Sequence, residues 1–260
     1  MKINKIYTTF DGEQNPYGIG MPTIFVRFQG CHIRCYAATL LTLCDTPEAL
    51  DRNSKEGIEM SPEKIVFELM EIRQRTGIHK VTITGGDPLH QKKSELLELF
   101  QQLVLSDFLI TVETSGTIDH YLYEKAVTPL NELSVESPIS WVLDYKGKSS
   151  GIPRRMNKLL NESYAKGLSI KDYIKFVIKD DADLEECANY VVKAYEEWDI
   201  QAVTVIGPYF GGEYDDPIKL FRKLESLGLF KYNVMLNFQT HQIINRDLAH
   251  RGKSYDKTEL

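Results

Sequence analysis

Short apolar stretches rich in β-branched and aromatic residues alternate along this chain with amphipathic stretches of helical length, and this rhythm constrains the fold more than any other feature. A chain that alternates strands and helices in this way builds an α/β fold whose parallel strands are joined by right-handed crossovers. About seven such strands form either an open doubly wound sheet or a partial barrel. The predicted strands are 23–28, 80–84, 109–113, 141–144, 174–178, 202–206 and 234–238, and the predicted helices are 62–76, 93–105, 183–197 and 217–227.

Length and composition indicate one folded domain over residues 1–260. Hydrophobic residues make up 42% of the 260 residues, which supports a core and excludes a disordered or fibrous protein. The net charge of −6 disfavours broad contact with nucleic acid or an anionic membrane. No stretch approaches the ~18 apolar residues of a membrane span, and residues 1–10 lack the apolar segment of a secretory signal. We therefore expect a cytoplasmic protein with no direct nucleic-acid partner and no membrane partner.

Residue types that carry chemistry follow the predicted strands at the points where the strands end. The segments concerned are 31–35, 85–88, 115–116, 144–146 and 239–241. The carboxyl ends of parallel strands meet at one edge of a sheet, and the loops that leave this edge carry the functional residues. The sequence therefore predicts one shared site at this edge.

Three of the four cysteines fall close together, at Cys31, Cys35 and Cys44. Three thiolates can hold three irons of a four-iron cluster and leave the fourth iron open to another ligand. Zinc is the rival interpretation, with His32 or Cys187 as the fourth ligand, although no C-x2-C knuckle is present. The three thiols could also be unrelated core residues. We expect Cys187 itself to pack in the core, because it shares one face of its predicted helix with apolar residues.

The segment Gly85-Gly86-Asp87-Pro88 directly follows a predicted strand. Glycines let the backbone approach a ligand closely, and a carboxylate can accept hydrogen bonds from an ammonium group. The alternative is an ordinary turn between a strand and a helix, so the motif gains weight only in combination with the cysteines.

The cysteine segment resembles the cluster-binding loop of radical S-adenosylmethionine (SAM) enzymes. The family pattern is C-x3-C-x2-C after the first strand, whereas here the second gap holds eight residues, 36–43. Such an extension adds little closure entropy, so the three thiolates can still converge. Segment 85–88 is similar to the Gly-Gly-Glu-Pro motif of the same superfamily. The resemblance implies a partial, incomplete TIM-like barrel with parallel strands, a 4Fe-4S cluster and bound SAM.

An ordered set of further segments resembles the 7-carboxy-7-deazaguanine synthases within this superfamily. The resemblance implies a lyase that converts 6-carboxy-5,6,7,8-tetrahydropterin to 7-carboxy-7-deazaguanine with loss of ammonia, toward queuosine-type nucleosides. It also implies that the cluster reduces SAM, which yields methionine and a 5′-deoxyadenosyl radical that takes a hydrogen from the pterin. The family usually has Gln where Asp11 stands. The matching segments are 10–13, 25–27, 112–117, 144–151, 175–177 and 239–241.

Roles for individual residues follow from this resemblance. Cys31, Cys35 and Cys44 would hold the cluster, and the hydroxyl of Thr46 would bind Mg²⁺, a cation that prefers oxygen ligands. The residues expected to line the SAM pocket are Gly85, Gly86, Asp87, Glu113, Ser115 and Lys146. The residues expected to face the pterin are Glu13, Arg27, Gln239 and His241, with Arg27 on the substrate carboxylate and Glu13 on its guanidine-like edge. The expected partners are an electron donor such as flavodoxin or ferredoxin and a second copy of the chain.

Simpler interpretations of several residues remain open. Arg27 could form a structural ion pair, His241 could be an ordinary histidine at a strand end, and Asp144 could bond only to backbone near Lys146. The basic run 154–158 is typical of solvated surface. Two other functions also fit the pattern: another small radical SAM enzyme such as a glycyl-radical activase, or a zinc-binding or cluster-free ligand-binding protein.

Overall fold

The computed structural model describes residues 1–260 except 36–43, 45, 131–137, 210, 241–242 and 244–260. Its described residues form one nine-stranded sheet with the order β3-β1-β2-β4-β5-β6-β7-β8-β9. Strands β2 to β9 run parallel, while β1 pairs antiparallel with β2 and β3. The strands are β1 (Lys2–Phe10), β2 (Pro22–Phe28), β3 (Ile58–Glu59), β4 (Lys80–Gly85), β5 (Leu109–Thr114), β6 (Ile139–Asp144), β7 (Tyr173–Ile178), β8 (Val203–Pro208) and β9 (Val234–Leu236).

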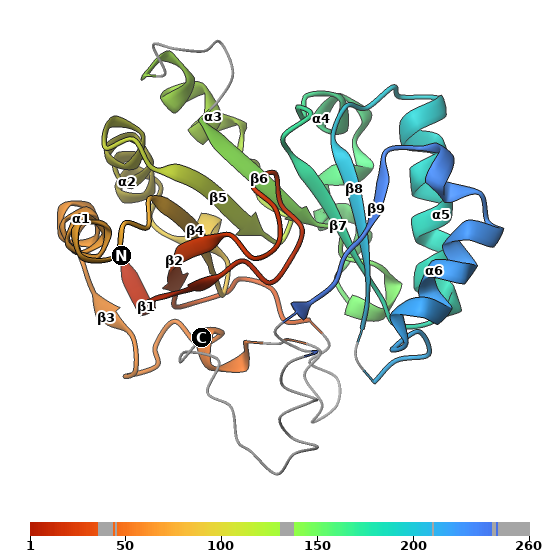
Figure 1. Cartoon of the computed structure of the whole chain (residues 1–260), viewed down its shortest axis with the longest axis horizontal. Helices are drawn as coiled ribbons and strands as arrows, with labels where there is room; N and C mark the ends of the chain where they lie inside the picture. Colours follow the sequence, from red (N-terminus) through yellow and green to blue (C-terminus); the bar gives the residue numbers. More distant parts are fainter. Residues whose placement is uncertain (36–43, 45, 131–137, 210, 241–242, 244–260) are drawn as a thin grey trace.

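Helices flank the strands on both sides of the molecule. In Figure 1, α1 and α2 lie beside the first half of the sheet and α5 and α6 beside the second half. Between described residues, β9 pairs with β8 only and β3 with β1 only, so the barrel is partial, as predicted. The helices are α1 (Pro62–Thr76), α2 (Lys93–Leu105), α3 (Tyr121–Val127), α4 (Glu162–Lys166), α5 (Asp181–Glu196) and α6 (Pro217–Ser226).

The loop between β1 and β2 joins the two ends of this open sheet. The backbone N–H of Gln14 donates to the Asn237 side chain at 2.9 Å, and the N–H of Thr240 donates to the Gly12 carbonyl at 2.8 Å. Gln239 also donates to the Glu13 carboxylate at 3.0 Å. The loop between β1 and β2 is therefore bonded to the segment after β9, and the Glu13 side chain takes part in these bonds.

The predicted helices have the local signals that explain them. Ser61 caps α1 by accepting from the Lys64 N–H, Pro62 occupies the first turn, and Gly77 ends the helix at φ +76°. Helix α2 has the predicted bounds, 93–105. Cys187 is fully buried on α5 within the main core, as predicted.

The sequence patterns missed two strands and two helices. β1 is half-buried over most of its length and lacks the apolar run of the central strands, and β3 is only two residues long. α3 and α4 have seven and five residues, too few for a clear helical period. None of the described helices combines the length and hydrophobicity that a membrane span requires.

Candidate functional site

The carboxyl ends of the parallel strands surround a cavity of about 360 Å³. Its lining comes from the ends of these strands and the loops after β2, β4, β5, β6, β7 and β8, from the segment after β9, and from the loop between β1 and β2, so the prediction of one shared edge is confirmed. The predicted site residues that line the cavity are Glu13, Cys31, Cys35, Cys44, Thr46, Gly85, Gly86, Glu113, Ser115, Lys146 and Gln239.

The three clustered cysteines share this cavity. Cys31 is 8% exposed, and burial raises the pKa of its thiol to about 11, assisted by the nearby Asp87 and Cys35. A buried thiol of this kind needs a positive partner to ionise, which an iron ion supplies. Among the described residues, no three thiol, imidazole or carboxylate groups lie close enough together to hold one metal ion. Three thiols spread around one cavity fit a multi-iron cluster better than a single zinc ion.

The residues considered as a fourth zinc ligand do not line the cavity. Cys187 is in the core of α5, and the His32 Nε2 atom lies 2.7 Å from the Thr117 hydroxyl. The described ligand set is therefore three cysteines, which leaves one corner of a four-iron cluster without a cysteine.

Glycines bring three backbone segments together beneath the cysteines. A Cβ on Gly86 would lie 2.3 Å from the Gly30 carbonyl oxygen and 2.7 Å from that of Ala49. Gly85 has φ +127°, and a Cβ there would lie 2.3 Å from the Phe28 carbonyl oxygen. Both positions require glycine, so the loop after β4 packs against the start of the cysteine segment.

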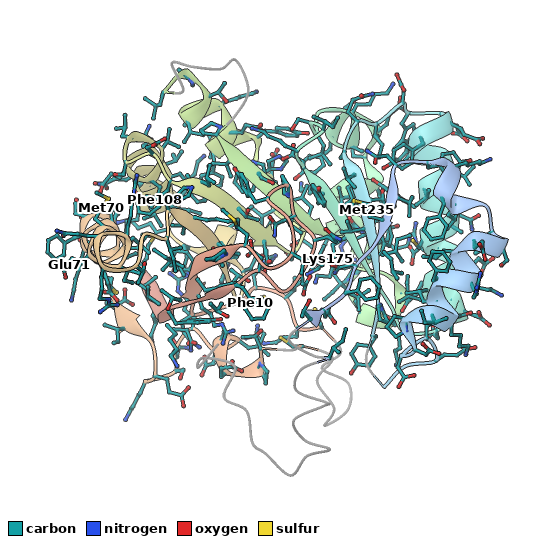
Figure 2. The ribbon with its side chains drawn as sticks, in the orientation of Figure 1. Phe10, Met70, Glu71, Phe108, Lys175 and Met235 are labelled. Carbon is teal, nitrogen blue, oxygen red and sulfur yellow. The ribbon has the colours of Figure 1, made fainter. Side chains whose placement is uncertain are left out.

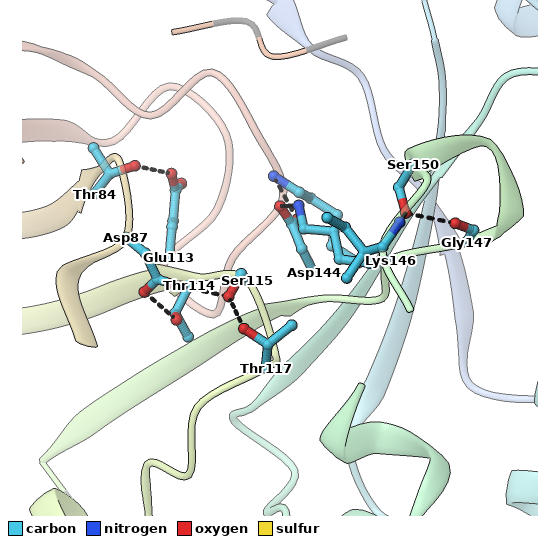
Figure 3. Close-up of polar contacts among 12 residues, drawn as sticks. Thr84, Asp87, Glu113, Thr114, Ser115, Thr117, Asp144, Lys146, Gly147 and Ser150 are labelled. Atoms are coloured by element: carbon cyan, nitrogen blue, oxygen red, sulfur yellow. Dashed lines mark hydrogen bonds and ion pairs between the residues drawn. The ribbon is translucent and has the colours of Figure 1, made fainter. Parts of the chain in front are cut away.

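Asp87 occupies a different place from the one predicted. It is 1% exposed and does not line the cavity. Its carboxylate accepts from the Leu89 N–H at 3.1 Å, from the Thr114 hydroxyl at 2.8 Å and from the Ser115 hydroxyl. Figure 3 shows this cluster beside Glu113. Asp87 thus fixes the turns after β4 and β5, because these bonds use both of its oxygens.

A row of alternating charges crosses the cavity. Lys175 Nζ lies 2.9 Å from Glu13 Oε2 and 3.1 Å from Asp144 Oδ1, and Lys146 Nζ lies 2.7 Å from Asp144 Oδ2. Figure 2 shows Lys175 between the two flanks of the molecule, and Figure 3 shows the contacts of Asp144. Asp144 therefore bonds to two side chains and not only to backbone.

The charges in this row shift one another's pKa values. Burial alone would raise the pKa of Asp144, but the ammonium groups of Lys146 and Lys175 outweigh burial and lower it to about 2. Burial would lower the pKa of Lys175, yet Asp144 and Glu13 raise it well above its usual value. Asp144 and Lys175 are thus charged at neutral pH.

Glu113 is the exception, because its environment favours the protonated form. Burial raises the pKa of its carboxyl to about 7, with Lys175 opposing this shift and Glu13 and Asp11 adding to it. The Thr84 hydroxyl donates to Glu113 Oε2 at 3.0 Å. A cavity carboxyl with this pKa can hold or release a proton near neutral pH.

Two of the residues predicted to face the substrate, Arg27 and His241, are not among the described residues that line the cavity. Arg27 does not line the cavity; its guanidinium contacts Glu48 and the Tyr7 hydroxyl, each at 3.0 Å, as in the simpler interpretation of an ion pair. His241 lies outside the described residues. Asp11, where the family usually has Gln, is buried and pairs with Lys80 at 2.7 Å.

Sequence reasoning assigned no role to several residues that shape the site. Thr84, Ser149, Ser150, Lys175, Lys179 and Tyr209 also line the cavity. A signal for Lys175 was present, since a charged residue inside an apolar strand must find a buried partner. The prediction of solvated surface for 154–158 holds for Arg154, Arg155 and Lys158, which are exposed, and is wrong for Asn157, which is buried.

The fold and this cavity define a radical SAM enzyme. Residues 26–136 match the family model described as the radical SAM superfamily. The chain is 32% identical over 216 residues to the 7-carboxy-7-deazaguanine synthase of Methanospirillum hungatei, covering 82% of this chain and 75% of that protein. It is 34% identical over 194 residues to the enzyme of that name from Leptospira interrogans, covering 74% and 76%. The chain belongs to the 7-carboxy-7-deazaguanine synthase family, and this family implies a lyase that uses a 4Fe-4S cluster and SAM.

A solved structure supports the fold independently. The crystal structure of Streptococcus suis SuiB bound to precursor peptide SuiA superposes with a TM-score of 0.54 at 16% sequence identity. The alignment covers 82% of this chain and 47% of SuiB, so the chain spans about half the length of that protein. At this identity, the match shows a shared fold only.

Proposed function

We propose that this enzyme converts 6-carboxy-5,6,7,8-tetrahydropterin to 7-carboxy-7-deazaguanine with loss of ammonia, in the biosynthesis of queuosine-type 7-deazapurines. One observation carries the proposal beyond family membership: a carboxylate with organised donors, Glu13, lines the same cavity as the three clustered cysteines. A cluster-bound cofactor and a substrate with a guanidine-like edge can therefore meet in one enclosed space.

The chain offers separate groups for the two cofactors. Cys31, Cys35 and Cys44 would hold the cluster, and the residues for SAM would be Gly85, Gly86, Glu113, Ser115 and Lys146. When bound, the cluster and SAM together supply the one-electron chemistry of the reaction. The protein binds and orients both reactants and keeps water away from them.

Glu13 is prepared for the substrate by three neighbours. Its carboxylate accepts from Lys175 at 2.9 Å, Asn237 at 3.2 Å and Gln239 at 3.0 Å, which fixes its orientation. A carboxylate fixed in this orientation can bind the N–H groups of the pterin ring by exchanging its Asn237 or Gln239 donor for them.

The substrate carboxylate requires a cation. We assign it to Arg27, which would exchange Glu48 for the substrate, with His241 as a further contact. The Glu48 side chain is 41% exposed and the Arg27 side chain 11%, so the exchange would break a partly exposed ion pair.

Glu113 can serve the proton balance of the reaction. Burial raises the pKa of its carboxyl to about 7, and the residue lies in the cavity wall. Loss of ammonia requires a proton on the departing nitrogen, and a buried carboxyl of this pKa suits that purpose.

Further features of the proposal concern the metal and the partners. Thr46 lines the cavity and would bind Mg²⁺ through its hydroxyl. An electron donor such as flavodoxin or ferredoxin, a homodimeric state and a cytoplasmic location complete the proposal.

The proposal is tested with the anaerobically reconstituted enzyme, SAM, a chemical reductant and the carboxy-tetrahydropterin. Mass spectrometry should detect 7-carboxy-7-deazaguanine, with one ammonia per product. Glu13→Gln, which keeps the size of the side chain, should reduce kcat/KM for the pterin about 100-fold because one charge-assisted contact is lost in a buried site. Reductive cleavage of SAM without any turnover of the pterin would contradict the substrate and favour another radical SAM reaction.

A further inference from the structure

Two buried carboxylates on α5 contact the loop that follows β6. Asp183 is 3% exposed and Glu186 is 8% exposed, and neither lines the cavity. They are three residues apart on the helix, so both project from the same face. Buried carboxylates are rare without partners, and here the partners are groups of the cavity loops.

Asp183 bonds to two separate loops. Its Oδ1 accepts from the backbone N–H of Ser149 at 2.9 Å, and its Oδ2 accepts from that of Lys179 at 3.2 Å. Ser149 and Lys179 both line the cavity. One carboxylate therefore sets the distance between the loops after β6 and β7.

Glu186 holds the preceding part of the same loop. Its Oε2 accepts from the Lys148 N–H at 3.0 Å, and its Oε1 accepts from the Tyr145 hydroxyl at 3.1 Å. The guanidinium of Arg154 pairs with it from the outside. Together the two carboxylates fasten residues 145–149 to α5.

Besides these bonds, the loop has the Lys146–Asp144 ion pair and hydrogen bonds within residues 147–152. Residues 146–151 contribute no side chain to the hydrophobic core, and their regular structure is the single short 3-10 helix Lys148–Ser150. A segment without core contacts takes its position from its hydrogen bonds. The two carboxylates therefore hold the backbone of Lys148 and Ser149, on either side of which Lys146 and Ser150 line the cavity.

Gly147 shows how closely the loop approaches the helix. Its φ of −67° is open to any residue, so backbone freedom does not explain the glycine. A Cβ at this position would lie 2.9 Å from Asp183 Oδ1. A larger residue here would push the Asp183 carboxylate away from its present position.

We propose that Asp183 and Glu186 are positioning residues for SAM, which hold the loop after β6 so that Lys146, Ser149 and Ser150 contact the cofactor. The inference rests on the proposed function, because it takes this cavity as the SAM site. Neither carboxylate touches the cofactor in this account; each acts through the backbone of the loop.

The test measures the Kd of SAM by equilibrium dialysis with the reconstituted enzyme. Asp183→Asn keeps the shape but turns an NH2 group toward one of two N–H donors, so one bond is lost. We expect SAM to bind about tenfold more weakly, the effect of losing one hydrogen bond to a charged group. Glu186→Gln should have a smaller effect on the loop, because its NH2 group can donate to the Tyr145 hydroxyl while its oxygen still accepts from Lys148. The contact that it loses is the one with the exposed Arg154.

Two controls on the same helix separate positioning from stability. Glu185→Gln removes an exposed charge on α5 and should change neither the Kd nor the Tm. Asp180→Ala removes the cap of α5, whose side chain accepts from Ala182 and Asp183, and should lower the Tm while leaving the Kd within about twofold. Iron content is measured in each variant to confirm equal cluster loading.

A substitution on the loop side keeps the inference falsifiable if Asp183→Asn does not fold. Gly147→Ala should weaken SAM binding, because the added Cβ would collide with the Asp183 carboxylate. In a chain that already carries Asp183→Ala this collision is absent, so adding Gly147→Ala should there weaken SAM binding less. SAM affinities within twofold of wild type for both Asp183→Asn and Gly147→Ala would overturn the positioning role and leave the proposed function intact. A wild-type enzyme that binds no SAM would overturn both.

Discussion

The ammonium group of Lys175 lies 2.9 Å from the Glu13 carboxylate, although 162 residues separate the two in the sequence. Lys175 belongs to β7, and Glu13 to the loop between β1 and β2. The ion pair connects this loop to β7, and the contacts of Asn237 connect the same loop to the segment after β9. The pair therefore has two roles: it fixes a carboxylate that lines the cavity, and it holds the loop between β1 and β2 against β7.

Lys175→Met tests the structural role of this pair. The substitution leaves Glu13 and Asp144 with fewer partners in a nearly buried site, and we expect a loss of about 3 kcal/mol in the free energy of unfolding. Urea denaturation measures this loss. Lys219→Met is the matched control, because its pair with Glu213 is exposed and contributes less than about 1 kcal/mol. Equal unfolding midpoints for the two variants would contradict the assignment.

Gly86→Ala should displace the backbone that carries the first cysteine. The added Cβ would lie 2.3 Å from the Gly30 carbonyl oxygen, and we expect a loss of about 3 kcal/mol in stability together with lower iron incorporation. Gly77→Ala is the control, since its φ of +76° involves strain of about 1 kcal/mol but its surroundings are open. Thermal melts and iron analysis compare the two, and normal iron content in Gly86→Ala would count against the close packing.

Glu113 predicts a definite pH dependence of stability. Its pKa is raised from 4.5 to about 7 in the folded state, so the folded chain binds an extra proton between these values. This contribution is fully present below pH 4.5 and is lost as the pH rises through 7. The shift corresponds to about 3 kcal/mol.

Glu113→Gln removes this titration while keeping an oxygen for the Thr84 hydroxyl. Between pH 5 and pH 8, the wild type should therefore lose more stability than the variant, as measured by urea denaturation without cofactors. Parallel stability curves for the two proteins would show that Glu113 titrates in its normal range.

Local signals explain why most of the fold could be predicted. α2 begins and ends at the predicted residues because its apolar period runs without interruption, and the central strands are apolar runs between turn residues. β1 lacked such a run, and its pairing with β2 and β3 depends on contacts distant in sequence. The predicted carboxyl ends of the strands placed the site at the correct edge of the sheet, because parallel strands all end at the same edge.

Motif position did not predict side-chain direction. Asp87 and Arg27 stand where the family motif places them, yet Asp87 turns to Thr114 and Ser115 and Arg27 to Glu48. The supporting carboxylates Asp183 and Glu186 could not be found from spacing, because their partners are backbone groups of another segment. The sequence thus predicted many of the residues that line the cavity, but not the residues that hold the cavity loops in place.

The most direct test of the account is iron and labile sulfide per chain after anaerobic reconstitution, for wild type, Cys44→Ala and Cys187→Ala. We predict about four irons in wild type, since three cysteines around one cavity hold a four-iron cluster with an open corner. Cys44→Ala should lose most of this iron, whereas Cys187→Ala, altered in the core, should keep it. Full iron loading in Cys44→Ala, or stoichiometric zinc in wild type, would contradict the account.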